Sequence, residues 1–176
     1  MKSSGFTEVQ GFRHIFVWGA AIALNILFTY AIIQQVFIGR PFGSTPASDT
    51  VLILLETFAA LLITFLFSIR LKTAISSDGI YYRFHPFQTK ATLIEWEDLS
   101  DAYIREYNSF YEYGGWGIRI GNSQNDRAIN TRGSGNLGLQ LEFKDGKLLL
   151  IGTAKPTEVK KALDEQLAAG KIKWGR

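Results

Sequence analysis

The sequence predicts an α+β membrane protein, in which a hairpin of two transmembrane helices precedes a small antiparallel β domain closed by one helix. Three observations predict this fold class. Residues 15–69 are almost wholly apolar, apolar and polar side chains alternate from Leu71 onward, and helical spacing returns only after Pro156. At 176 residues, the chain is long enough for a membrane hairpin and one soluble domain.

The two apolar runs predict membrane spans. Residues 15–38 and 51–69 contain about 24 and about 19 residues, enough for a helix to cross roughly 30 Å of hydrocarbon. Neither run has a polar face at helical spacing, which is typical of helices in a membrane. Residues 39–50, with two prolines and two glycines, predict the connecting loop, and residues 1–14 a short polar segment ahead of the hairpin.

Charges at the ends of the spans predict the orientation. Lys2, Arg13, Arg70 and Lys72 flank the hairpin, whereas the loop has only Arg40 together with an aspartate. Because cytoplasmic ends carry the excess of Lys and Arg, we expect a multi-pass protein of the inner (cytoplasmic) cell membrane with both termini in the cytoplasm.

Alternating side chains predict a β domain over residues 71–168. About seven short strands are expected, with Asp78-Gly79 and Asp145-Gly146 as hairpin turns. One-sided alternation indicates antiparallel strands with one buried face, arranged as a barrel or a sandwich. Pro156 suits the first turn of a final helix that Gly170 ends, and residues 169–176 are expected to form a flexible tail.

Several stretches carry a resemblance. They are Ser77-Asp78-Gly79-Ile80-Tyr81-Tyr82-Arg83, Ile94-Glu95-Trp96-Glu97-Asp98-Leu99, Gly114-Gly115-Trp116-Gly117-Ile118-Arg119, and Gly146-Lys147 with Ile151-Gly152-Thr153 before the final helix. As a set over residues 13–168, the chain resembles bacterial membrane proteins that pair two transmembrane helices with a pleckstrin-homology-like (PH-like) domain. The resemblance implies a fold and a topology but no catalytic residues. The first hairpin turn is short and acidic, unlike the basic turn of PH domains that bind inositol lipids.

Several classes of site are not expected. The chain has no cysteine, and His85 is the only histidine after the N-terminal segment, so we expect no catalytic set, metal site or cofactor. The net charge of +3 is spread thinly, which argues against binding to nucleic acid. Gly133-Ser134-Gly135-Asn136-Leu137-Gly138 matches a dinucleotide fingerprint, but a strand rather than a helix follows it, so we interpret it as a hairpin loop.

Aromatic side chains crowd one turn between strands. Tyr107, Phe110, Tyr111 and Tyr113 suit packing within the domain, contact with the membrane interface, or contact with a protein partner.

The glycine-rich stretch that follows suggests either packing or binding. Trp116 can fill the core beside a bulge, or form a platform for a ligand with Arg119 as the anion donor. In the packing interpretation Arg119 faces outward and pairs with Glu106 or Glu112.

One carboxylate lies within the second span. Glu56 is expected to hydrogen-bond Gln34 or Tyr30 of the first span and so join the two helices, although a proton or ion site is the alternative.

Together these observations predict a non-enzymatic, membrane-anchored binding or scaffolding module. Its partners would be membrane lipids through the spans, and a protein or a second copy of the chain through the domain. The first alternative is a protein that binds lipid or another small ligand. An oligomeric transport component or an enzyme comes after it, because the sequence favours these two classes less.

Overall fold

The computed structural model describes residues 4–121, 123–131 and 135–171. These residues divide into two compact units. The helical unit is Arg13–Ser68, and the folded unit comprises the described residues of Met1–Phe12 and Ile69–Arg176.

The helical unit consists of α1 (Ile15–Ile32), continued by the π-helical turn η1 (Ile33–Phe37), and α2 (Asp49–Ser68). Thr29 in α1 donates a hydrogen bond to Glu56 in α2, and the ring of Trp18 packs edge-on against Phe67. The first contact joins the later part of α1 to the first half of α2, and the second joins the start of α1 to the end of α2. The two helices are therefore antiparallel. Gln35 organises the loop by donating to Ala47 O and Asp49 Oδ1, both at 2.7 Å.

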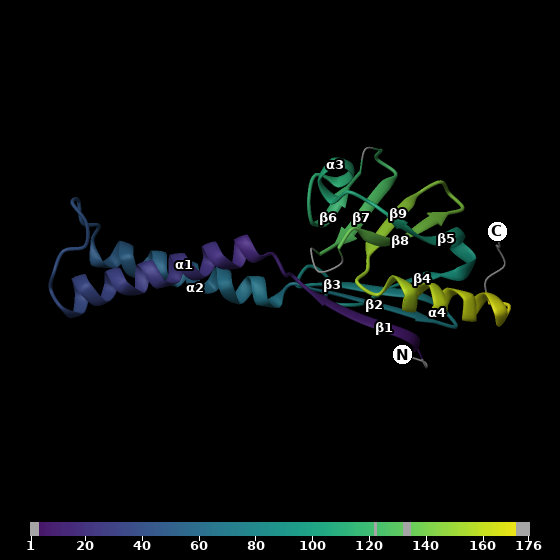
Figure 1. Cartoon of the computed structure of the whole chain (residues 1–176), viewed down its shortest axis with the longest axis horizontal. Helices are drawn as coiled ribbons and strands as arrows, with labels where there is room; N and C mark the ends of the chain where they lie inside the picture. Colours follow the sequence, from purple (N-terminus) through teal and green to yellow (C-terminus); the bar gives the residue numbers. More distant parts are fainter. Residues whose placement is uncertain (1–3, 122, 132–134, 172–176) are drawn as a thin grey trace. The chain divides into compact units, whose positions relative to one another are not determined.

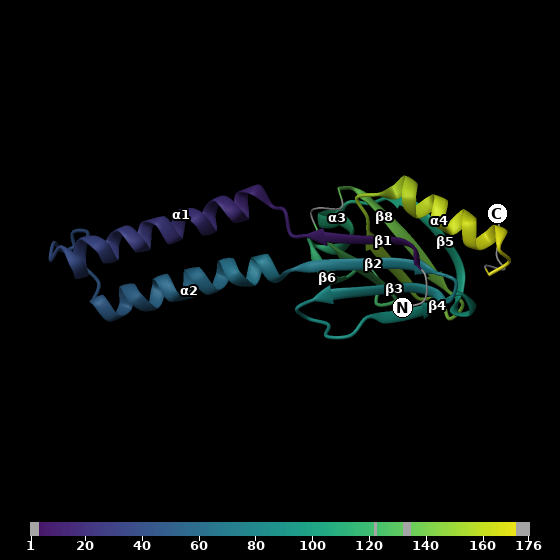
Figure 2. The same ribbon diagram turned by 90° about the horizontal axis from the view of Figure 1, so that it is seen from below.

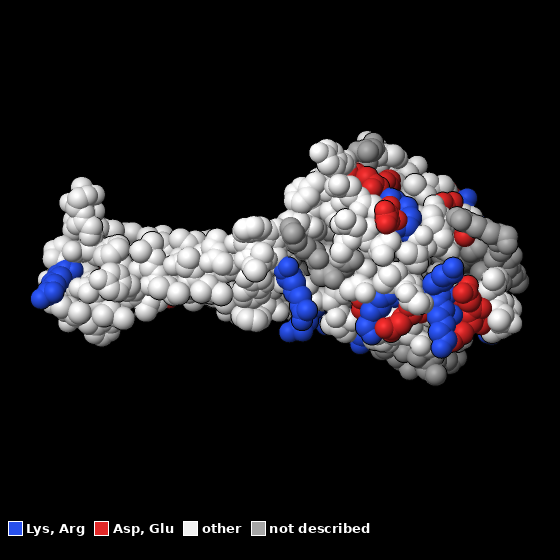
Figure 3. All heavy atoms as spheres, in the orientation of Figure 1, with Lys and Arg blue, Asp and Glu red and all other residues white. Residues whose placement is uncertain are grey.

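Both helical stretches are long and apolar enough to cross a membrane. Ile15–Phe37 has 23 residues and Asp49–Ser68 has 20, and only 11% and 17% of their most apolar windows are buried. Neither is therefore covered in the way that the core helix of a soluble domain would be. On the face that Figure 3 shows, the helices are almost wholly uncharged between their ends, whereas charged side chains of both signs gather on the folded unit.

The folded unit contains two sheets. The first has the order β1-β2-β3-β4, with β1 (Ser4–Gly11), β2 (Arg70–Ser76), β3 (Gly79–His85) and β4 (Thr92–Glu95) side by side (Figure 2). The second has the order β5-β8-β9-β7-β6. Its strands are β5 (Leu99–Glu106), β6 (Gly117–Ile120), β7 (Asp126–Asn130), β8 (Leu137–Phe143) and β9 (Leu148–Gly152). A 3₁₀ turn, η2 (Trp96–Asp98), links the two sheets.

The main core lies between these sheets and under α4 (Pro156–Ala168), which is drawn in yellow in Figure 1. Leu71, Ile75 and Ile80 face it from the first sheet, and Leu139, Leu141 and Ile151 from the second. Val159, Ala162 and Leu163 of α4 complete it. The indole of Trp96 is buried and donates to Ser76 O at 3.1 Å. Pro156 begins the helix and Gly170, with φ +67°, follows its end, as predicted.

Three features correct the predicted fold. The described residues form nine strands in two sheets and no closed barrel, where about seven strands were expected. One strand pair, β7 with β9, is parallel. The third correction concerns residues 1–14, because Ser4–Gly11 pairs with β2 along its length and belongs to the folded unit.

The N-terminal strand is held by polar contacts that its sequence does not reveal. Glu8 is 5% exposed and accepts hydrogen bonds from Thr153 Oγ1 at 2.7 Å and from the Ala154 amide at 2.9 Å. Gln10 is equally buried, donates to Gly152 O and accepts from Thr131 Oγ1. These bonds connect β1 of the first sheet to the second sheet and to the start of α4.

Candidate functional site

The folded unit contains an apolar pocket with a volume of about 660 Å³. It lies where β1 ends, β2 begins and β3 ends, and the edge strand β6 supplies its opposite wall. Its apolar side chains come from segments far apart in the sequence: Phe12, Ile69, Phe84, Phe87, Phe110, Trp116 and Ile118. Three glycines, Gly114, Gly115 and Gly117, complete that part of the lining.

Aromatic rings form most of the wall. Trp116 is half-buried and packs edge-on against Phe12, with centroids 6.4 Å apart, and against Phe110 at 4.7 Å. Phe84 and Phe87 stack with their ring planes 8° from parallel. Edge-on and stacked rings fix one another's orientation, so the pocket has a defined shape.

Local sequence positions Trp116. Asn108 caps the short helix α3 (Ser109–Tyr113) by accepting from the amides of Phe110 and Tyr111. Gly114 ends the helix with φ +65°, and Gly117 has φ +104°, a region that side-chain-bearing residues rarely adopt. A Cβ built on Gly114 or Gly117 meets no atom within 4 Å, so the space beside these two glycines is open.

The pocket lining has two polar side chains, Asn130 and Arg119. Asn130 is fully buried, and its Oδ1 accepts from the Gly117 amide at 3.2 Å, which fixes the orientation of the amide group. Its Nδ2 has no hydrogen-bond partner among the described residues. Arg119 is exposed, and its Nε donates to Trp116 O at 2.8 Å.

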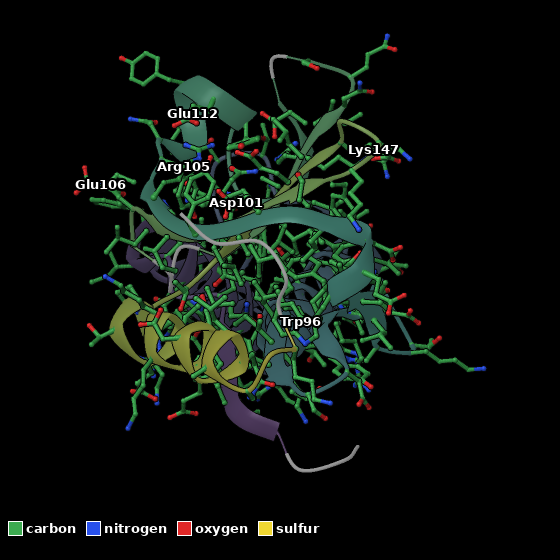
Figure 4. All side chains as sticks on the ribbon, turned by 90° about the vertical axis from the view of Figure 1, so that its right-hand side faces the viewer. Trp96, Asp101, Arg105, Glu106, Glu112 and Lys147 are labelled. Atoms are coloured by element: carbon green, nitrogen blue, oxygen red, sulfur yellow. The ribbon has the colours of Figure 1, made fainter. Side chains whose placement is uncertain are left out.

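A polar network fastens α3 to the second sheet. Arg105 donates to Glu112 at 2.7 Å and to the hydroxyl of Tyr113 at 2.9 Å, and that hydroxyl donates to Asp126 Oδ1 at 3.1 Å. Figure 4 shows Arg105 and Glu112 next to each other beside α3. Burial, followed by the charge of Asp126, raises the pKa of Tyr113 well above its ordinary value. Burial also raises the pKa of Asp126, although the Tyr113 hydrogen bond and the Arg105 charge oppose it. Neutral Tyr113 therefore acts as a fixed donor that secures the pocket wall.

The structure separates the four aromatic residues predicted to form one contact surface. Tyr107 and Tyr113 are 4% and 3% exposed and pack against each other in a second small core with Ala128 and Leu150, so they are not free to contact a membrane or partner. Phe110 and Tyr111 are 58% and 86% exposed. Of these four residues, only Phe110 lines the pocket.

The predictions for the glycine-rich stretch are partly wrong. Trp116 lines the pocket and is not one of the buried core residues, which differs from the packing interpretation and leaves the binding interpretation open. Ile118 and Ile120 of the edge strand β6 are 49% and 65% exposed. Arg119 is exposed, as the packing interpretation expects, but it pairs with neither Glu106 nor Glu112, and Glu112 instead bonds Arg105.

In the helical unit, Glu56 bonds a residue other than those predicted. Its Oε1 accepts from Thr29 Oγ1 at 3.0 Å, whereas Gln34 donates to the hydroxyl of Tyr30. The predicted link between the helices is therefore present through Thr29. The second carboxylate oxygen is buried without a partner among the described residues.

The remaining predicted features are placed as follows. His85 is half-buried at the end of β3. Gly133 and Ser134 of the glycine-rich motif, and residues 172–176 of the predicted tail, lie outside the described residues. Within the described ranges, no three His, Asp or Glu side chains are grouped closely enough to hold a metal ion.

Sequence reasoning missed Phe12, Ile69, Phe84, Phe87 and Asn130, which meet at the pocket only after the sheets form. The single signal for the site was the stretch from Gly114 to Arg119. No protein-family model matches the chain, and no curated protein sequence matches it.

Proposed function

We propose that this protein is a non-enzymatic, membrane-anchored binding module whose pocket receives an acyl chain of a membrane lipid. α1 and α2 span the inner cell membrane with both termini in the cytoplasm, and the folded unit is PH-like. The two sheets and the C-terminal helix α4 support the PH-like assignment. The charged ends of the spans support the orientation.

The observation that carries this proposal is the identity of two pocket residues. Phe12 and Ile69 line the pocket, and they are also the residues at which the chain passes between the folded unit and the helical unit. Ile69 directly follows the last residue of α2, and three residues after Phe12, at most about 11 Å of extended chain, α1 begins. Covalent connection alone therefore keeps this side of the pocket close to the ends of the spans.

The size and chemistry of the pocket fit an acyl chain. Sites for small ligands typically have volumes of roughly 300–1,000 Å³, with apolar walls and a few polar groups. This pocket matches in volume, in its aromatic wall, and in having two polar lining residues. A protein partner, which the sequence analysis expects for the domain, would instead need a broad exposed surface.

Photo-crosslinking in bilayers tests the proposal. The full-length chain is reconstituted with a phospholipid that carries a diazirine on one acyl chain, and adducts are mapped by mass spectrometry. We expect adducts on Phe12, Phe87 or Trp116 in addition to those on the spans. Adducts restricted to residues 15–68 would contradict the proposal.

Two neighbouring residues of α3 provide a matched pair. Phe110→Glu places a carboxylate on the pocket wall and should reduce the pocket adducts severalfold. Tyr111→Glu introduces the same charge one residue away, on a side chain that does not line the pocket, and should leave the adducts unchanged.

A further inference from the structure

The hydrophobic effect cannot select a lipid for this pocket. An acyl chain that moves from a bilayer into an apolar pocket exchanges one apolar environment for another, so little free energy is gained from burial. Any selectivity must therefore come from the polar groups of the lining, which are Asn130 and Arg119.

Asn130 provides a donor that the protein does not use. A buried amide hydrogen without an acceptor is unfavourable, and most buried polar groups in folded proteins have a partner. Asn130 Oδ1 accepts from the Gly117 N–H, so exchanging the positions of Oδ1 and Nδ2 would place two donors against each other. Nδ2 therefore stays where it is, without a hydrogen-bond partner among the described residues. An acceptor such as an ester carbonyl satisfies this donor.

Arg119 provides a positioned cation. Its Nε is fixed on Trp116 O, and its Nη2 lies 3.6 Å from the site of a Cβ on Gly115, so the guanidinium rests against the glycine turn. It forms no ion pair with any residue that the structure describes. A guanidinium held in this way suits a phosphate.

The strand register relates these two groups. Gly117 pairs with Asn130 and Arg119 pairs with Ala128, so Asn130 and Arg119 lie on one face of adjacent strands, offset by two residues or about 7 Å. A glycerophospholipid likewise carries an ester carbonyl a few bonds from its phosphate. We infer that the pocket selects an anionic glycerophospholipid, with Asn130 donating to an acyl ester carbonyl and Arg119 pairing with a phosphate that has no ammonium group of its own headgroup beside it. This inference rests on the proposed function.

The test uses full-length protein in detergent micelles and three lipids with the same brominated chains. They are ester-linked phosphatidylglycerol, ester-linked phosphatidylcholine and ether-linked phosphatidylglycerol. Bromine quenches tryptophan at contact, and subtracting the signal of Trp116→Phe isolates the pocket. We expect half-maximal quenching at about tenfold lower concentration for the anionic ester than for either other lipid. The ether lipid lacks the carbonyl that accepts the hydrogen bond, and the choline ammonium of phosphatidylcholine repels Arg119 from the phosphate that both headgroups share.

Variants assign each preference to its residue. Arg119→Gln should abolish the preference for phosphatidylglycerol over phosphatidylcholine, whereas Arg127→Gln, which removes an exposed arginine outside this pocket, should retain it. Asn130→Leu should abolish the preference for ester over ether. Equal quenching of wild-type protein by all three lipids would overturn the inference while leaving the proposed function intact. If no lipid quenched Trp116, both would be wrong.

Discussion

Replacing Glu8 tests whether the N-terminal strand belongs to the folded unit. Glu8→Leu removes the acceptor for two hydrogen bonds, from the Thr153 hydroxyl and the Ala154 amide. Thr153 is 3% exposed, so its hydroxyl loses its acceptor in a place that water does not reach. Ala154 is exposed, and water replaces the lost partner there.

The magnitude follows from these environments. An unpaired buried hydroxyl costs about 1–3 kcal/mol, and losing a bond to a charged acceptor costs about 1.5–3 kcal/mol. Relief from burying a carboxylate and the apolar burial of leucine offset part of this loss. We expect Glu8→Leu to lower the free energy of unfolding by about 2–4 kcal/mol, and Glu8→Gln, which retains one acceptor, by about half as much.

The assay is urea unfolding of the full-length protein in detergent, followed through tryptophan fluorescence, because Trp96 is buried in the same core. The control is Val9→Thr, which alters the next side chain on the same strand where it is 55% exposed, and should change stability by less than about 0.5 kcal/mol. If Glu8→Leu were as stable as this control, the contacts that we assign to β1 would not hold the strand.

Three further predictions concern other parts of the chain. Tyr113 has a folded-state pKa above its unfolded value of about 10, so its contribution to stability is present below pH 10 and is lost as the pH rises through the folded pKa. The free energy of unfolding should therefore fall more steeply above pH 10 in wild-type protein than in Tyr113→Phe. Parallel curves of stability against pH would refute this. Glu56→Gln retains an acceptor for its threonine partner, so thermal unfolding in detergent should change by less than about 1 kcal/mol, and a larger loss would show that the carboxylate itself is required. Because the chain has no cysteine, a single introduced cysteine reports on which side of the membrane its position lies. In intact cells an impermeant maleimide should label Ser44→Cys in the loop but not Asp145→Cys in the folded unit. Labelling of Asp145→Cys alone would show the opposite orientation.

Regular alternation made part of the fold predictable. The β2–β3 hairpin follows from alternating side chains around Asp78-Gly79, and Gly79 is required because a Cβ there would lie only 2.0 Å from Ile94 O. The α4 helix follows from Pro156, apolar spacing and Gly170. In these elements the local pattern and the tertiary environment agree.

β1 was not predictable from pattern, because polar residues occupy its inward face. Glu8 and Gln10 resemble surface residues, and only their partners more than 100 positions away make burial possible. For β6 the sequence pattern misleads in the opposite direction, because it indicates burial where the side chains are exposed. Its isoleucines alternate like core residues, but the strand lies at the edge of its sheet and leaves them exposed.

The candidate site was predictable only in its local part. The glycines around Trp116 signal an unusual backbone, and positive φ at Gly114, Gly115 and Gly117 confirms it. The remaining wall depends on bringing Phe12, Ile69, Phe84 and Phe87 together, which is a consequence of strand pairing rather than of any local motif.

The most direct test of lipid binding in the pocket is native mass spectrometry of protein purified gently from membranes. Wild-type protein and Tyr111→Glu should each retain one phospholipid per chain, and Phe110→Glu should lose it. Equal retention by Phe110→Glu, or wild-type protein free of lipid under conditions that preserve its fold, would contradict the account.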